Sequence, residues 1–437
     1  MKKNSTKILS LLLAVLLILS SLPTTAFAAD EEKKLYDYTL LYTDHDGTNH
    51  IELTWYNGSE ENVVIPSEFD GAVVDTVQAN FGDLKNIKSI TVSEGIKTID
   101  KLWFWSSKNV DIYLPSSVVS IGSEAIRNNK INTIHFSEGL VSIDHYAFLD
   151  TEFKNTDIKL PESLEYLNPA SFNGTNIQKI HLGSKVRFAD YDYNFGDPII
   201  DEHDKEDSDF EVFYECLSLA FITVSPDNEY LTAVDDVLYN KDMTVLYRFP
   251  SKHNSDFEKN NPVYDYEIPE SVKYLAPYSF GDANIYINKL TFNSKIETIP
   301  KRAFRKANIN EIDWGDNCNI KVIESEAFYG LTTTLSSFEI SLKLPASVER
   351  ICSDAFAYSD ITTIDFETPS NCKVIEQGAF HRCYKVKSIF IPNSVESLGI
   401  EGQSDYGTFE DCNYNNSIVF EAVSYTHLRA HETAANL

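Results

Sequence analysis

One repeat accounts for most of this sequence. Short segments that alternate apolar and polar residues recur, and their first apolar residues, Ile90, Ile112, Ile134, Ile158 and Ile180, are 22, 22, 24 and 22 residues apart. Period-two alternation predicts a β-strand with one buried face, and a fixed period of this length predicts a stack of similar coils. The pattern continues at Ile222/Val224, Tyr247/Phe249, Tyr266/Ile268, Leu290/Phe292, Ile312/Trp314, Leu342/Leu344, Ile364/Phe366 and Ile389/Ile391.

A second element keeps the same period. Ala-Phe or Ser-Phe pairs lie in many repeats, and several are 24 residues apart, as from Phe280 to Phe304 and on to Phe328. A Ser-Val-x-x-Ile-Gly segment, such as residues 117–122, lies between the strand and this pair. No single coil can bury its apolar face alone, so the coils must stack on one another. We therefore predict parallel pairing between adjacent coils and a buried column of phenylalanines.

The unit x-Leu/Ile-x-Ile-x-Leu-Pro-x-Ser-Val-x-x-Ile-Gly-x-x-Ala-Phe-x-x-Cys resembles the BspA-like leucine-rich repeat. The resemblance covers residues 63–412, and residues 237–250 resemble a variant repeat common in that family. It implies a repeat solenoid: a right-handed coil with a curved parallel β-sheet on its concave face, mostly β, with short helical or irregular convex segments. Members of that family are secreted or surface proteins of bacteria, often implicated in adhesion.

The N-terminus carries an export signal. Three lysines within the first seven residues precede an apolar run at residues 8–19, and Ala-Phe-Ala follows at residues 26–28. This order is typical of a secretory signal peptide, which we place at residues 1–28. A membrane anchor is the alternative, although the apolar run is short for a bilayer. We expect a secreted or cell-surface protein with no membrane span in its mature chain.

The rest of the chain divides into three parts. Residues 29–62 are expected to form an N-terminal β-hairpin cap, with strands near residues 40–42 and 51–55. Residues 63–422 are expected to form the leucine-rich-repeat solenoid. Residues 423–437 resemble the translation of a sequencing adaptor, so we expect an artefactual tail on a gene sequence cut short; an ordinary polar tail is the alternative.

Charge and cysteine content limit the partners and the chemistry. The chain has 66 acidic and 37 basic residues, a net charge of −29. Such a surface repels phosphate backbones, which excludes nucleic acid as a partner. Cys216, Cys383 and Cys412 each follow a phenylalanine by three residues, so we predict one recurrent slot in which buried thiols pack as small apolar groups. Three other cysteines share no such register, and a disulfide among them stays open: Cys318, Cys352 and Cys372.

The repeat spacing breaks between Leu182 and Val224, which are 42 residues apart. The excess forms an acidic insertion around residues 187–211. Clustered carboxylates could hold calcium, but the run lacks the glycine and the terminal glutamate of a calcium loop. A solvated acidic loop is the favoured interpretation, with calcium binding as the alternative.

We find no catalytic constellation in the sequence. It contains no Gly-rich phosphate loop, no His-Glu-x-x-His and no paired-cysteine zinc spacing. His381 and Cys383 suggest a nucleophile with its base, but Cys383 already has a structural slot. We therefore predict no catalytic residues, no metal and no cofactor. Trp103 and Trp105 flank Phe104 and form a candidate aromatic platform, with packing between coils as the alternative.

The residue between the two buried positions of each strand points outward, onto the expected concave sheet. We predict a monomeric, adhesin-like protein that binds a protein or glycan on a host or neighbouring cell through these residues, and not an enzyme. Two alternatives remain: the targeting region of a larger secreted enzyme whose catalytic domain is missing, and an architectural envelope component. The candidate ligand-binding residues are Tyr113, His135, Lys159, His181, Thr223, Arg248, Glu267, Asp313, Lys343, Asp365 and Phe390, with Thr91 and Thr291 in the same column.

Overall fold

The computed structural model describes residues 34–82, 86–104, 109–188, 212–252, 264–281, 285–334, 339–399, 407–412 and 419–422. The chain forms two compact units, Met1–Leu35 and Tyr36–Leu437, and all described strands lie in the second. The expected signal peptide, residues 189–211 of the acidic insertion, Trp105 and the expected tail lie outside the described residues.

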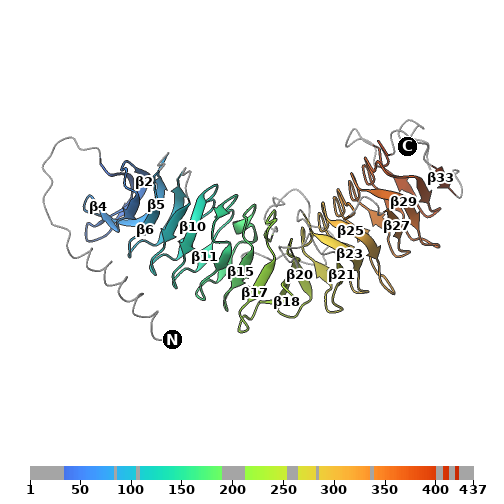
Figure 1. Cartoon of the computed structure of the whole chain (residues 1–437), viewed down its shortest axis with the longest axis horizontal. Helices are drawn as coiled ribbons and strands as arrows, with labels where there is room; N and C mark the ends of the chain where they lie inside the picture. Colours follow the sequence, from blue (N-terminus) through green and yellow to red (C-terminus); the bar gives the residue numbers. More distant parts are fainter. Residues whose placement is uncertain are drawn as a thin grey trace. The chain divides into compact units, whose positions relative to one another are not determined.

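One series of strands, the front strands, follows the alternating segments of the sequence. Each front strand pairs in parallel with a strand of a neighbouring coil, and the coils follow one another in chain order (Figure 1). Alternate side chains are buried, as in β6, where Ile90 and Val92 face the core and Thr91 faces out. The front strands are β3 (Asn62–Ile65), β6 (Ser89–Val92), β8 (Val110–Tyr113), β10 (Lys130–His135), β12 (Glu152–Phe153), β13 (Asp157–Lys159), β15 (Lys179–Leu182), β17 (Phe221–Val224), β21 (Tyr264–Glu267), β23 (Tyr286–Thr291), β25 (Asn308–Asp313), β27 (Ile340–Leu344), β29 (Ile361–Phe366), β31 (Ser388–Ile391) and β33 (Val419–Ala422).

A second parallel series, the back strands, was not expected from the sequence. It forms where the Ser-Val-x-x-Ile-Gly segments lie, and many of its members are only two residues long. In β9 the second residue, Ile121, is buried, while Ser120 faces away from the core. The back strands are β5 (Ala72–Asn80), β7 (Thr98–Trp103), β9 (Ser120–Ile121), β11 (Ser142–Ile143), β14 (Tyr166–Leu167), β16 (Arg187–Phe188), β22 (Tyr274–Leu275), β24 (Thr298–Ile299), β26 (Val322–Ile323), β28 (Arg350–Ile351), β30 (Val374–Ile375) and β32 (Ser397–Leu398).

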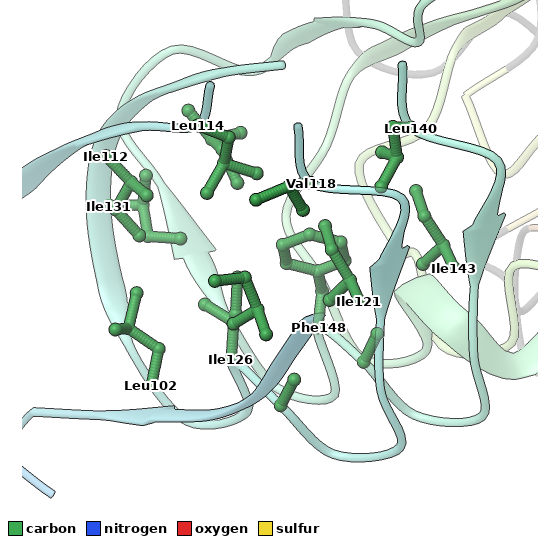
Figure 2. Packing of buried hydrophobic residues seen from close by; sticks show 14 of the residues in the cluster. Leu102, Ile112, Leu114, Val118, Ile121, Ile126, Ile131, Leu140, Ile143 and Phe148 are labelled. Carbon is green, nitrogen blue, oxygen red and sulfur yellow. The ribbon is translucent and has the colours of Figure 1, made fainter. Parts of the chain in front are cut away.

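The core fills the space between the two series. Ile112 and Ile131 enter it from β8 and β10, Ile121 and Ile143 enter it from β9 and β11, and Phe148 enters from the following turn (Figure 2). All five side chains are at most 1% exposed. Apolar burial of this kind is the main source of stability, and each coil needs its neighbours to provide it.

The predicted column of phenylalanines is confirmed. Phe304 stacks between Phe280 and Phe328, with ring centroids 4.7 and 4.9 Å away and interplanar angles of 21° and 6°. The column continues through Phe356 and Phe380 at centroid distances of 5.0 and 5.2 Å. A shorter run joins Phe148 and Phe172 at 4.8 Å.

The turn before several of the column phenylalanines has a left-handed residue. Tyr146, Arg302, Glu326 and Asp354, each two positions before a column phenylalanine, have φ values between 52° and 59°. Such a residue interrupts a helix, so successive turns replace the helical segment that leucine-rich repeats can carry. Among the described residues, the one helical element is the 3-10 helix η1 (Pro169–Phe172).

The predicted cysteine slot is confirmed, and the structure corrects the reason for it. The thiols of Cys216, Cys383 and Cys412 are buried, but each donates a hydrogen bond to a phenylalanine carbonyl of the preceding coil, at 3.1, 3.2 and 3.0 Å. Ser359 fills the same slot, since its hydroxyl donates to the Phe328 carbonyl at 2.9 Å. The slot therefore selects a small donor. All six cysteines lie in described residues, and all six are free thiols.

An antiparallel hairpin precedes the first coils. β1 (Tyr36–Thr43) pairs with β2 (Asn49–Tyr56), and both expected strands, near residues 40–42 and 51–55, lie within them. β2 then pairs in parallel with β5, so the hairpin extends the back strands. The two-residue β4 (Glu68–Phe69) pairs with the start of β5.

The prediction for Arg248 is wrong. The segment was expected to be a front strand with Arg248 facing out, but β20 (Val245–Arg248) pairs with back strand β22. The extra strands β18 (Leu231–Val234) and β19 (Val237–Asn240) shift the register, so Phe249 enters the column, 4.9 Å from Phe280. Arg248 is therefore fully buried, and its guanidinium donates to the Tyr278 and Gly281 carbonyls at 2.7 and 3.1 Å.

Candidate binding face

The outward column of the front strands is the candidate site. Apart from Arg248, each predicted residue lies on a front strand and is exposed or half-buried. Apart from Phe390, which packs partly against the core, these side chains are not part of the core clusters, so the fold does not fix their identity. The column consists of Thr91, Tyr113, His135, Lys159, His181, Thr223, Glu267, Thr291, Asp313, Lys343, Asp365 and Phe390.

The first half of the column combines aromatic rings with a cation. Tyr113 and His135 are paired by register, and their rings stack with centroids 4.4 Å apart and planes within 4°. Lys159 is exposed and pairs by register with His181. The His181 Nδ1 atom lies 2.9 Å from the hydroxyl of Thr223 on the next strand. Register therefore brings together residues that are 22 to 42 positions apart in the sequence.

The second half is acidic, and one of its carboxylates, Asp313, is paired with a neighbouring lysine. Glu267, Thr291 and Asp313 are in register on β21, β23 and β25. The Lys289 ammonium lies 2.7 Å from Asp313 and 3.4 Å from Glu311. Hydrogen bonds from Lys289 and from the Gly315 N–H lower the pKa of Asp313. The two halves of the face thus differ in chemistry.

Trp103 and the His381/Cys383 pair, the other two candidates from the sequence, both pack against neighbouring residues. Trp103 is half-buried, with the Arg127 guanidinium 5.6 Å above its ring, and Phe104 is buried. Burial raises the pKa of the Cys383 thiol well above its ordinary value, so little nucleophilic thiolate is present. His381 beside it is also buried, which favours the structural interpretation of this pair.

No cluster of three or more His, Cys, Asp or Glu side chains in the described part of the chain has the arrangement of a metal site. Within the same residues, no helix is both long enough and apolar enough to cross a membrane.

The hairpin holds a charged cluster that sequence reasoning missed. His50 lies between two carboxylates: its Nδ1 is 2.6 Å from Asp75 and its Nε2 is 2.9 Å from Asp44. The Tyr42 ring stacks on the imidazole at 4.4 Å, and its hydroxyl donates to Asp75 at 3.1 Å. Ionised carboxylates only accept, so both ring nitrogens donate when His50 is protonated. Burial alone lowers the pKa of His50, but the hydrogen bonds to Asp44 and Asp75 outweigh it and raise the pKa.

This cluster predicts a pH-dependent contribution to stability. Because the folded-state pKa of His50 is raised, its contribution is fully present below the ordinary histidine value of about 6.5 and is lost as pH rises through the folded value. We expect wild type to exceed His50→Gln in free energy of unfolding by more at pH 6 than at pH 9, measured by urea denaturation. If the difference in free energy of unfolding is the same at the two pH values, His50 is not stabilised by Asp44 and Asp75.

Comparisons with known proteins agree with this architecture. The family described as BspA type leucine-rich repeat region matches residues 76–196, 252–364 and 319–428, in six copies. A leucine-rich repeat protein from Eubacterium ventriosum is 19% identical, with 86% of this chain and 92% of that chain covered and a TM-score of 0.51. The pneumococcal vaccine antigen PcpA is 22% identical, with 92% and 90% covered and a TM-score of 0.53. Among curated proteins, none matches.

The family match covers well over half of the sequence, and the matched ranges contain most of the front and back strands. Both solved structures support the same fold. On these grounds the chain belongs to the BspA type leucine-rich repeat family.

Proposed function

We propose that this protein is a secreted or cell-surface binding protein, adhesin-like in the broad sense. It acts through the outward column of the front strands, on a protein or glycan of a host or neighbouring cell. The N-terminal sequence supports export. Family membership supports a surface role, by analogy of fold.

One observation carries the proposal. Most coils present an outward side chain on their front strand, and these side chains include rings, cations and carboxylates, several of them in fixed register. Repeat proteins use such extended faces to bind macromolecules, because many weak contacts can be made at once without reorganising the fold.

The test is a binding screen of the exported chain against matrix proteins and cell-envelope polysaccharides. For the partner found, we expect the double variant Lys159→Glu/His181→Glu to lower affinity at least about tenfold, a loss of about 1.4 kcal/mol. Lys101→Glu, on back strand β7, is the matched control, since it reverses one exposed charge away from the front face.

Equal effects of the two changes would place the binding site elsewhere. Capture of no partner by the wild-type protein would count against a binding role altogether.

A further inference from the structure

We infer that the first half of the outward column recognises a linear polysaccharide carrying carboxylate or sulfate groups. This rests on the proposed function and names its partner class. The residues concerned are Tyr113, His135, Lys159 and His181, one from each of four successive coils.

Lys159 offers an exposed cation to an acidic ligand. Lys159 is exposed, and within the described residues no carboxylate forms an ion pair with it. Two acidic residues close to Lys159 in the sequence have other partners. Asp157, on the same strand, lies 3.7 Å from the Lys179 ammonium, and the Glu162 carboxylate accepts the Ser184 N–H at 2.7 Å. Hydrogen bonds from Ser184, and more weakly the charges of His181 and Lys159, lower the pKa of Glu162. Since no carboxylate of the described residues is within ion-pair distance of Lys159, its ammonium is open to an external anion.

The charge of the column around Lys159 also favours an anionic ligand. From Thr91 to Thr223 the column contains no carboxylate, although acidic residues outnumber basic ones 66 to 37 in the chain. At physiological ionic strength the screening length is about 8 Å, so the local charges decide what approaches this part of the face. The second half, with Glu267, Asp313 and Asp365, repels the same ligand.

The rings of Tyr113 and His135, on the two coils before Lys159, favour a sugar ligand. Tyr113 is 41% exposed, yet its ring is held parallel to that of His135 at 4.4 Å. A ring held in this way loses little side-chain entropy when a ligand covers it. The pair offers apolar ring carbons for the C–H groups of a sugar, and a phenol and imidazole for its hydroxyl groups.

Spacing favours a glycan over an acidic peptide. Paired strands such as β8 and β10, or β13 and β15, lie about 4.8 Å apart, which is close to the length of one pyranose ring. Within each of these pairs, a polysaccharide that crosses the strands therefore meets one column residue per sugar. An extended peptide rises about 3.3 Å per residue and does not keep this register.

The experiment measures binding of the full chain to four probes: polygalacturonate, dextran sulfate, neutral dextran and poly-glutamate. We expect one or both anionic polysaccharides to bind, with the first two probes telling carboxylate from sulfate. Lys159→Glu should weaken this binding at least about tenfold, whereas the matched change Lys343→Glu in the second half should leave it within about twofold. Unchanged thermal melting of both variants checks their folding.

Three results would overturn the inference. The first is that neutral dextran or poly-glutamate binds as tightly as the anionic polysaccharides. The second is that Lys343→Glu weakens binding as much as Lys159→Glu. The third is that none of the four probes binds. If no probe binds, but the Lys159→Glu/His181→Glu variant loses affinity for a protein partner, this inference fails and the proposed function stands. If that double variant changes the binding of no partner, both fail.

Discussion

Phe304→Ala should lower the free energy of unfolding by about 3 to 5 kcal/mol. The Phe304 ring is fully buried and lies between the rings of Phe280 and Phe328. It also contacts Phe292 edge-on, at a centroid distance of 5.7 Å. Truncation removes apolar contacts on three sides and leaves a cavity that the flanking coils can fill only by shifting the stack.

Urea denaturation followed by circular dichroism measures this effect. The matched control is Phe221→Ala, because Phe221 is 38% exposed on front strand β17 and should cost less than about 0.5 kcal/mol. A loss at position 304 no larger than that at position 221 would mean that the column does not hold the coils together.

Gly315→Ala should cost about 2 to 5 kcal/mol, because two penalties combine. Gly315 has φ +73°, a left-handed conformation that costs an L-residue about 1 to 2 kcal/mol. In addition, a Cβ at this position would lie 2.1 Å from the carbonyl oxygen of Phe292, which belongs to the neighbouring coil. Relieving that overlap requires backbone movement, at about 1 to 3 kcal/mol more.

Gly71→Ala isolates the first penalty. Gly71 has φ +77°, but a Cβ there would meet nothing within 4 Å. We expect this variant to lose only about 1 to 2 kcal/mol in the same denaturation assay. If Gly315→Ala and Gly71→Ala lower the free energy of unfolding by the same amount, the neighbouring coil does not pack closely against Gly315.

The sequence predicted the front strands and the phenylalanine column for the same physical reason. Period-two alternation in segments such as residues 88–92 fixes which side chains are buried, and it needs no knowledge of distant residues. The constant step between phenylalanines such as Phe280 and Phe304 places them at the same angle around the coil. Burial and stacking then follow from repetition alone.

The back strands and the turns could not be predicted in this way. A two-residue strand such as β9 is too short to show alternation, and it exists because neighbouring coils align it. Left-handed residues such as Arg302 and Glu326 are not glycines, so the sequence gives no signal for them. Arg248 was misplaced because an extra pair of strands shifts the register, which the local pattern around Tyr247 does not reveal.

Most of the candidate face follows from the strand pattern, but its chemistry depends on register. That Tyr113 points outward is a property of its own strand, whereas its stacking on His135 depends on how two coils align. The His50 cluster was missed because Asp75 is 25 residues away and lies on a strand that pairs with the hairpin.

Hydroxyl-radical footprinting tests the central claim most directly, because it reports the solvent exposure of individual rings. With the tightest-binding partner of the screen, we predict protection of Tyr113 and His135 on the front face. Tyr384 and Tyr358, 53% and 37% exposed in the turns around the phenylalanine column, should react as in the free protein. Protection of Tyr384 and Tyr358 with Tyr113 unchanged would contradict the account.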